Sequence, residues 1–271
     1  MTDAAAGALV DAWPAEHVAV GVLIGDGQQW RRGDPDRRYE LASVSKLLVS
    51  NAVWIALEEG ALELDQPAGP PGSTIRHLLA HASGLPFEGA QPIAEPGARR
   101  IYSNTGFEML AATLEAATEM TWQDYVTAAV LEPLAMSSTT LGVSAARSAH
   151  STLNDLLAWS AEMLTPRLVS SATVTEATSN QFGGLDGVVP GFGQQRPCPW
   201  GLGVELKGTK APHWTPSTGS ARTFGHFGAA GTFCWVDPVH RIAAVGLGDL
   251  AFGDWAVDLW PRLGDELLGL G

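Results

Sequence analysis

Residues 40–48 read ELASVSKLL, and this short stretch carries the strongest chemical signal in the chain. Ser43 and Lys46 are three positions apart, so on a helix their side chains lie on one face and can touch. Ser43 stands in the first turn, where free backbone N–H groups point outward. Lys46 is the only charged residue between Glu40 and Glu58, so it lies within an apolar helix. A lysine buried in this way needs a partner or a chemical role.

The pair could serve as a nucleophile and its base. Burial and the positive end of a helix both disfavour the charged form of Lys46, which lets the amine take the proton of Ser43. The alternative is an N-cap serine followed by an ordinary solvated lysine, because this spacing is too short to be specific alone.

The rest of the chain predicts strands at both ends and helices between them. An apolar, β-branched run at 17–27 favours a strand, and we expect the first 41 residues to be strands throughout. The glycine-rich stretch 181–199 has no periodicity and predicts a long loop. We expect helices at 73–81, 103–118, 121–132 and 151–164, and strands at 200–206, 231–237 and 240–248. This order argues for one sheet made from both termini, with a helical insertion.

The composition of the chain excludes some classes of partner. The chain has 271 residues, 45% of them hydrophobic, which is enough for a sizeable core. Its net charge of −13 argues against nucleic acid as a partner. The longest apolar stretch, 47–57, is too short for a membrane span, and the acidic N-terminal stretch does not resemble a signal peptide. We therefore expect a cytoplasmic protein without a membrane partner. Cys198 and Cys234 form neither a zinc motif nor a disulfide framework.

A series of motifs follows Ser43 and Lys46 along the chain. They are GALELDQP at 60–67, IRHLLAHASGLP at 75–86, YSN at 102–104, VLEPLAM at 130–136, WGLGVEL at 200–206 and GHFGAAG at 225–231. In this order the chain resembles the serine β-lactamase and penicillin-binding protein superfamily, specifically its class C β-lactamase-like branch, over roughly residues 17–250. The resemblance implies an α+β fold: an antiparallel sheet from both termini, flanked by helices, with an inserted all-helical subdomain. We expect 1–60 and 190–271 to form the sheet domain and 61–189 the helical subdomain, with the active site between them.

The same resemblance implies roles for Ser43 and Lys46, which form the family's first catalytic motif, and for Tyr102 and Asn104, which belong to its second. Ser43 would be the acyl-accepting nucleophile and Lys46 its activating amine. Tyr102 would share the role of base, and Asn104 would hydrogen-bond the lysine and the substrate. Taken alone, Tyr102 could also be a half-buried aromatic at a turn, and Asn104 the N-cap of the next helix.

Residues 226–228 correspond to the third catalytic motif of the family, and here this third motif departs from the family pattern. His226 and Phe227 stand where the family has a lysine or histidine followed by a Thr or Ser that helps to bind a substrate carboxylate. Gly228 would allow close backbone approach, and the N–H of Ala229 would pair with that of Ser43 as an oxyanion hole. The charge on His226 would depend on pH. This departure favours an ester or amide over a β-lactam or a D-alanyl peptide. Trp200, Trp214 and Phe227 are candidates for the walls of the cleft.

Three weaker signals remain. His77 and His81 have the spacing of a zinc motif but lack its glutamate, so we expect no metal. GVSAA at 142–146 approaches the nucleophile elbow of α/β-hydrolases, which would make Ser144 an alternative nucleophile. Arg99 and Arg100 predict a solvated turn just before Tyr102, and the alternative is that they contact an anionic substrate.

The leading hypothesis is a serine hydrolase that acts through an acyl-enzyme on a small ester or amide, without a cofactor. The alternatives are a β-lactamase or DD-peptidase proper, or a penicillin-binding or regulatory module with little turnover. The expected partner is a small-molecule ester, amide or β-lactam. The sequence does not predict the oligomeric state.

Overall fold

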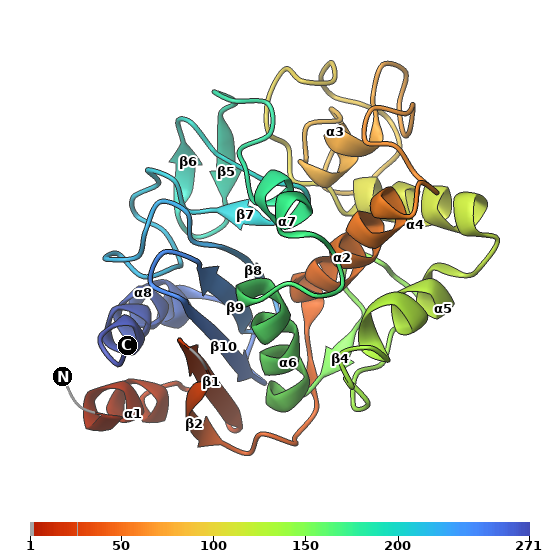
Figure 1. Cartoon of the computed structure of the whole chain (residues 1–271). Coiled ribbons are helices and arrows are strands. Elements are labelled where there is room, and N and C mark those ends of the chain that lie inside the picture. The colour runs from red at the N-terminus through yellow and green to blue at the C-terminus, as the bar shows by residue number, and fades with distance from the viewer. Residues whose placement is uncertain (1–2, 26) are drawn as a thin grey trace.

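The computed structural model describes residues 3–25 and 27–271 and has a six-stranded antiparallel sheet at its centre (Figure 1). The strand order is β2-β1-β10-β9-β8-β7. An N-terminal strand therefore pairs with a C-terminal one, in a register that runs from Val18 opposite Gly248 to Ile24 opposite Ile242. The strands are β1 (Val18–Ile24), β2 (Gln28–Gly33), β7 (Glu205–Leu206), β8 (Phe224–Gly228), β9 (Thr232–Asp237) and β10 (Ile242–Gly248). The predicted sheet from both termini is confirmed.

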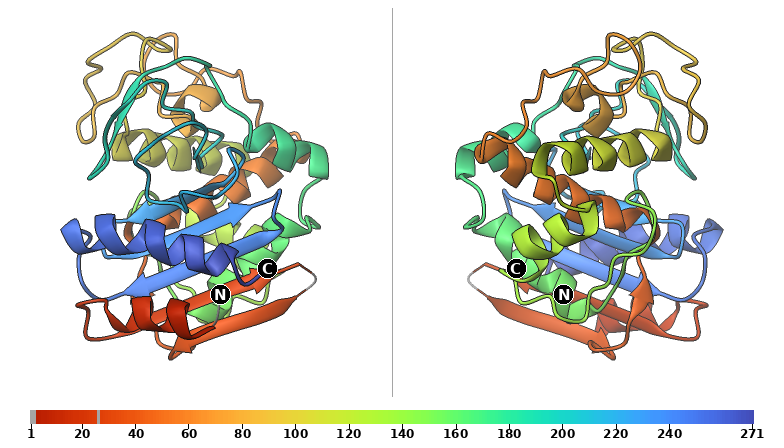
Figure 2. Two further views of the ribbon diagram at one scale, coloured as in Figure 1. Left: turned by 90° about the vertical axis from the view of Figure 1, so that its left-hand side faces the viewer. Right: turned by 90° about the vertical axis from the view of Figure 1, so that its right-hand side faces the viewer.

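Helices cover both faces of the sheet, which explains why its central strands are apolar on both sides. Along β1, Ala19 and Leu23 contribute to one hydrophobic cluster, whereas Val20 and Val22 contribute to another. This is the period of two that a strand imposes. Figure 2 shows helices on the two faces. Helices α1 (Asp3–Asp11) and α8 (Asp254–Leu268) pack with the second cluster, and α6 (Leu153–Leu164) packs with the first.

The remaining helices surround α2 (Ser45–Glu58), which is buried along nearly its whole length (Figure 1). Its apolar residues occur on all sides, as expected of a central helix. Around it lie α3 (Ile75–Leu79), α4 (Asn104–Thr118), α5 (Trp122–Val126) with a π-helical continuation (Thr127–Leu131), and α7 (Ser171–Ala177). In the described part of the chain, no helix is long and apolar enough to cross a membrane.

Several expectations about local structure were wrong. Residues 3–11 form a helix rather than a strand, because their sequence is rich in alanine, the best helix former. Helix α6 falls within 61–189 but packs on the sheet, because its apolar face covers β1 and β10. The stretch 181–199 contains a short hairpin, β5 (Gly187–Val189) and β6 (Gly193–Gln195). Of the strand expected at 200–206, only β7 pairs with β8. Two further short strands, β3 (Tyr39–Glu40) and β4 (His150–Ser151), pair with each other.

Candidate active site

Ser43 lies in a 3₁₀ turn, Ala42–Val44, immediately before α2. The residue before it, Ala42, has a φ of 45°, in the left-handed region that is unfavourable for a residue with a side chain. Such strain persists only where the surrounding structure enforces it, and it is concentrated at functional sites. The sharp turn leaves Ser43 partly exposed on a cavity while its neighbours are buried.

The end of β8 holds this turn in place. A Cβ atom on Gly228 would lie 2.2 Å from the carbonyl oxygen of Leu41, so only glycine allows the two backbones to approach. Thr232 on β9 donates its hydroxyl to the same carbonyl at 2.9 Å. The end of β8 and the serine turn are therefore in direct contact at Gly228.

Lys46 is completely buried and is the second residue of α2. Its Nζ donates to Asn104 Oδ1 at 2.7 Å and to the backbone oxygen of Ala146 at 2.8 Å, and it lies 3.4 Å from Ser43 Oγ. Among the described residues, no carboxylate lies within ion-pair distance of this amine. Burial therefore lowers the pKa of Lys46 well below its usual value, and Glu108 opposes this only in part. A neutral amine next to a serine hydroxyl is suited to take its proton.

Tyr102 connects the serine to the third motif. Its hydroxyl lies 3.3 Å from Nε2 of His226. Burial raises the pKa of Tyr102 well above its ordinary value, and a hydrogen bond from Ser43 opposes this rise. The phenol is thus protonated at neutral pH. This makes it a proton relay between other groups rather than a base that is already ionised.

His226 is neutral, which corrects the expectation of a pH-dependent charge. Its Nδ1 lies 2.7 Å from the carbonyl oxygen of Phe227, which can only accept, so Nδ1 carries the hydrogen and Nε2 is free to accept from Tyr102. Burial and, next, the charge of Lys46 lower the pKa of His226 to about 3. A fixed positive charge, which a lysine at this position would supply, is therefore absent near neutral pH.

The structure places Asn104 at the first residue of α4, with its side chain turned to Lys46. The N-cap of this helix is Ser103, whose Oγ accepts from the N–H of Gly106 at 3.0 Å. Asn104 is therefore free of the capping role considered as its alternative. Its Nδ2 donates to Glu88 Oε1 at 3.0 Å.

Ser43 and Ala229, the two residues expected to form the oxyanion hole, line the same cavity. In residues 3–25 and 27–271, no turn, loop or cap hydrogen bond to a carbonyl engages the N–H of either residue. Ala229 follows directly after the close contact at Gly228. Both amides are thus available to a carbonyl oxygen bound beside Ser43.

The cavity beside Ser43 has a volume of about 550 Å³ and walls that are mostly apolar. Trp200 and Phe227 contribute to the walls, as expected. Trp214 does not, since it is only 1% exposed and packs in the core under α8. Its apolar surface is buried there because its indole N–H finds a partner in Glu205, at 2.8 Å. The apolar lining residues are Phe87, Ile101, Val188, Val189, Pro190, Trp200, Phe227, Ala229 and Phe252.

Sequence reasoning did not identify Glu205, which lines the cavity although it is only 1% exposed. Its carboxylate accepts from Lys210 Nζ at 2.7 Å and lies 3.0 Å from His213 Nε2. The motif WGLGVEL contains Glu205, but nothing in its spacing points to partners further along the chain.

Arg100, expected in a solvated turn, is buried. It is 5% exposed and donates to the backbone oxygens of Ala80, Gln181 and Cys198. These carbonyls compensate for part of the loss of water around the guanidinium. Arg99 lines the cavity and is exposed.

The histidines of the HLLAH segment are used in packing. His77 pairs with Thr74 at 2.9 Å, and His81 Nδ1 accepts from the N–H of Ser103 at 3.2 Å. The two rings thus have separate partners. Ser144 of the GVSAA stretch donates to Glu108, and the antiparallel sheet is not that of an α/β-hydrolase, so this alternative was wrong.

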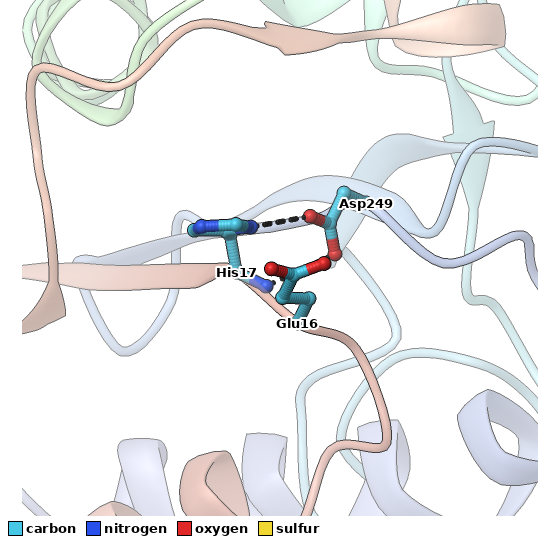
Figure 3. Close-up of side chains that lie close together, drawn as sticks. All are labelled: Glu16, His17 and Asp249. Atoms are coloured by element: carbon cyan, nitrogen blue, oxygen red, sulfur yellow. Dashed lines mark hydrogen bonds and ion pairs between the residues drawn. The ribbon is translucent and has the colours of Figure 1, made fainter.

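Outside the cavity, one cluster in the described residues has donors close enough together for a metal ion: Glu16, His17 and Asp249 (Figure 3). His17 Nδ1 lies 2.7 Å from Asp249 Oδ2, and the side chains of these two residues are 38% and 33% exposed. This contact joins the start of β1 to the end of β10 at the surface. The hydrogen bond between His17 and Asp249 is therefore sufficient to account for the closeness of these side chains.

Comparison with known proteins identifies the family of the chain. A family model described as Beta-lactamase matches residues 2–263. Among solved structures, a β-lactamase from Mycobacterium bovis is 47% identical, covers 98% of each chain and superimposes with a TM-score of 0.96. A penicillin-binding protein homologue from Pyrococcus abyssi is 19% identical, with a TM-score of 0.78 over 97% of this chain and 75% of that one, which shows a shared fold.

Among curated proteins, Penicillin-binding protein 4* of Bacillus subtilis is 31% identical over 134 residues. This alignment spans 37% of the present chain and 30% of the relative, so less than a third of the relative is matched. Because the family model covers nearly the whole chain, the chain belongs to the β-lactamase family, within the superfamily of serine β-lactamases and penicillin-binding proteins.

Proposed function

We propose that this protein is a serine hydrolase that cleaves small neutral esters or amides through an acyl-enzyme on Ser43. The observation that carries the proposal is the environment of Lys46. Its amine is fully buried, contacts Ser43 Oγ at 3.4 Å and has two neutral oxygens as its other partners. This arrangement supports a lysine that is neutral, and therefore basic, at physiological pH.

The reaction would begin as Ser43 Oγ bonds to the substrate carbonyl carbon and its proton passes to Lys46. The N–H groups of Ser43 and Ala229 would stabilise the negative charge on the carbonyl oxygen, a contribution worth about 3 kcal/mol per donor in related chemistry. As the tetrahedral intermediate collapses, the bond to the leaving group breaks, and Tyr102 relays the proton from Lys46 to that group. Water then attacks the acyl-enzyme by the reverse route, which releases the acid and restores Ser43.

The third motif supports a neutral substrate. His226 is uncharged because the pKa of its imidazole is about 3, and Phe227 offers no hydroxyl to a carboxylate. Both residues line the cavity, together with the apolar side chains already named. Charged residues, among them Arg99, Asp186 and Glu205, also line the cavity, but its walls are mostly apolar, which is typical of sites that bind an apolar acyl or alcohol group.

The test is intact-mass analysis of the wild type and of Ser43→Ala after exposure to a fluorophosphonate and to a chromogenic neutral ester. We expect the wild type to gain the mass of one phosphonyl group and to hydrolyse the ester, and Ser43→Ala to do neither. Equal labelling and turnover by both proteins would exclude Ser43 as the nucleophile.

A second candidate is favoured by the relative at 47% identity, which is described as a β-lactamase. On this alternative the substrate is a β-lactam. The same assay with a penicillin separates the possibilities. Rapid return to the free mass with loss of the β-lactam indicates a β-lactamase, and a persistent adduct indicates a penicillin-binding module with little turnover. No adduct and no loss of the β-lactam support the ester or amide hydrolase.

A further inference from the structure

The two oxygens that accept hydrogen bonds from Lys46 are themselves fixed by carboxylates. Asn104 Oδ1 and the Ala146 carbonyl lie 2.7 and 2.8 Å from Nζ. A neutral amine has two hydrogens and one lone pair. If both hydrogens are given to these oxygens, the lone pair is left for the remaining neighbour, Ser43 Oγ at 3.4 Å. The positions of the two acceptors therefore decide where the basic electron pair points.

Glu88 fixes the first acceptor. Asn104 could present either its oxygen or its NH₂ group to Lys46, and the two orientations differ by a flip of the amide. The NH₂ group donates to Glu88 Oε1 at 3.0 Å, and a carboxylate can only accept. Glu88 thus selects the orientation in which the oxygen faces Lys46. Glu88 is in turn held by Arg147 Nη1 at 2.7 Å.

Glu108 fixes the second acceptor. Its carboxylate accepts from the hydroxyl of Ser144 and from the N–H groups of Ala145 and Ala146, the latter two at 3.2 and 3.4 Å. Three donors on consecutive residues therefore converge on one side chain. This explains the GVSAA stretch: its serine anchors a loop whose last carbonyl faces Lys46.

Helix α4 carries both Asn104, which is the first acceptor, and Glu108, which fixes the second. Asn104 and Glu108 are four residues apart, so they lie on the same face of the helix. Arg147 follows Ala146 directly, and its bond to Glu88 joins the loop to the segment that holds Asn104. The result is a closed ring of contacts around one side of Lys46.

We propose that Glu88 and Glu108 are positioning residues, each of which orients one acceptor of Lys46 and so directs the amine towards Ser43. The inference rests on the proposed function, since it assigns Lys46 the role of base. Neither carboxylate is within ion-pair distance of Nζ among the described residues, so both act through another group. Charged groups that face Lys46 are Glu108, Arg147 and Glu88, and the neighbouring histidines are His81 and His226.

Glu88→Ala is the primary variant, because the Glu88 side chain is 51% exposed and its loss is compatible with folding. Freed from Glu88, the Asn104 amide can turn its NH₂ group towards Lys46. We expect kcat and the rate of Ser43 phosphonylation to fall by about tenfold, with KM changed less than twofold. Glu88→Gln retains an acceptor for Asn104 and should restore the rate to within twofold of the wild type. Glu95→Gln, on the same loop, is the matched control.

Glu108→Gln tests the second arm. We expect a loss of kcat of about tenfold to 100-fold, because the amide's NH₂ group would face donors of the loop. Removal of this charge also lowers the pKa of Lys46, so the acid limb of the kcat profile should move to lower pH. Loss of folded protein alone would not move that limb. Glu115→Gln is the control, because Glu115 is on the same helix and accepts from the N–H of Trp122 at 3.0 Å.

A substrate-free measurement separates this inference from the proposed function. NMR titration of protein carrying ¹³C at lysine Cε should show the pKa of Lys46 falling in Glu88→Ala and Glu108→Gln but not in the two controls. If the wild type does not react with the fluorophosphonate, the proposed function fails, whatever the titration shows. If it reacts, and both variants keep its rates, its acid limb and its titration, the positioning role is overturned.

Discussion

Among the residues that the structure describes, Lys46 and Lys210 have side chains with no exposed surface, and they differ in the charge of their partners. The amine of Lys46 contacts two neutral oxygens and a hydroxyl. That of Lys210 lies 2.7 Å from the carboxylate of Glu205. The two sites are close, since Glu205 and Ser43 line the same cavity.

The difference in partners is the reason that we propose Lys46, and not Lys210, as the base. Burial lowers the pKa of Lys46 because no contacting carboxylate stabilises its charge. Burial alone would raise the pKa of Glu205, but Lys210 and His213 more than offset this and hold it well below its usual range. The Glu205 carboxylate is therefore ionised, and hydrogen bonds from its neighbours satisfy it. A buried lysine becomes a base when neutral acceptors replace a carboxylate, and these acceptors must then be held in place.

The largest predicted effect is the loss of activity in Lys46→Met. Removal of the proposed base should lower kcat/KM for a neutral ester by about 100-fold to 10,000-fold. The free energy of unfolding at pH 7 should stay the same or rise, since a buried amine is replaced by an apolar side chain of similar length. Ester kinetics and urea denaturation measure the two quantities. A variant that kept its activity would show that Ser43 is activated by another group.

Lys210→Met should have the opposite profile. It leaves the Glu205 carboxylate buried without its main counter-charge, so the free energy of unfolding should fall by about 3–5 kcal/mol. The activity per folded molecule should change only a few-fold, because Lys210 does not line the cavity. Adding Glu205→Gln to Lys210→Met should recover part of the lost stability. If Lys210→Met were as stable as the wild type, Lys210 would not stabilise the buried charge of Glu205.

The pH dependence of stability should distinguish the lysines further. The folded-state pKa of Lys46 is lowered below the value of about 10.4 expected in the unfolded chain. Between these two values the unfolded state binds more protons, so stability rises with pH there. We expect the wild type minus Lys46→Met difference in unfolding free energy to increase from pH 7 to pH 9 by at most about 1.4 kcal/mol per pH unit. A difference independent of pH would mean that Lys46 is charged in the folded protein throughout this range.

At acidic pH, the stability of the protein should depend on the pair formed by Glu205 and Lys210. The pKa of Glu205 is lowered on folding, so its contribution is present above the unfolded value of about 4.3 and is lost as the pH falls below it. The same denaturation series, extended to pH 4 with Glu205→Gln as reference, should show the wild type losing its advantage.

The burial of Lys46 could be predicted from the sequence, whereas that of Lys210 could not. Lys46 is conspicuous because it is the only charge in a long apolar helix, one turn after a serine. Lys210 lies in a stretch of glycines and prolines, where a charged residue is ordinary. Its burial depends on Glu205 and Trp200, and this pairing arises only in the folded chain.

Other features also divide into those that local sequence encodes and those that depend on contacts made only in the folded chain. The order of strands and helices is encoded locally by hydrophobic period and was predicted well, apart from the alanine-rich helix α1, the hairpin within 181–199 and most of the strand expected at 200–206. The neutrality of His226 depends on complete burial beside Lys46, and its tautomer depends on a contact with the Phe227 carbonyl. The roles of Glu88 and Glu108 depend on hydrogen bonds to Asn104 and to the loop at 144–146. Spacing in the sequence cannot reveal which donor a carboxylate meets across the fold.

The smallest predicted effect concerns His226→Gln. The amide oxygen of glutamine can accept from Tyr102 as the histidine does, so kcat should fall by about tenfold or less. Because the pKa of His226 is about 3, this residue does not titrate between pH 5 and pH 9, and the acid limb of the kcat profile should keep its midpoint in the variant. His150→Gln, at an exposed position, is the control. If the limb persists, it belongs to Lys46 and its coupled neighbours; if it disappears, the titrating group is the histidine, and the contrast between the two lysines does not explain the catalysis.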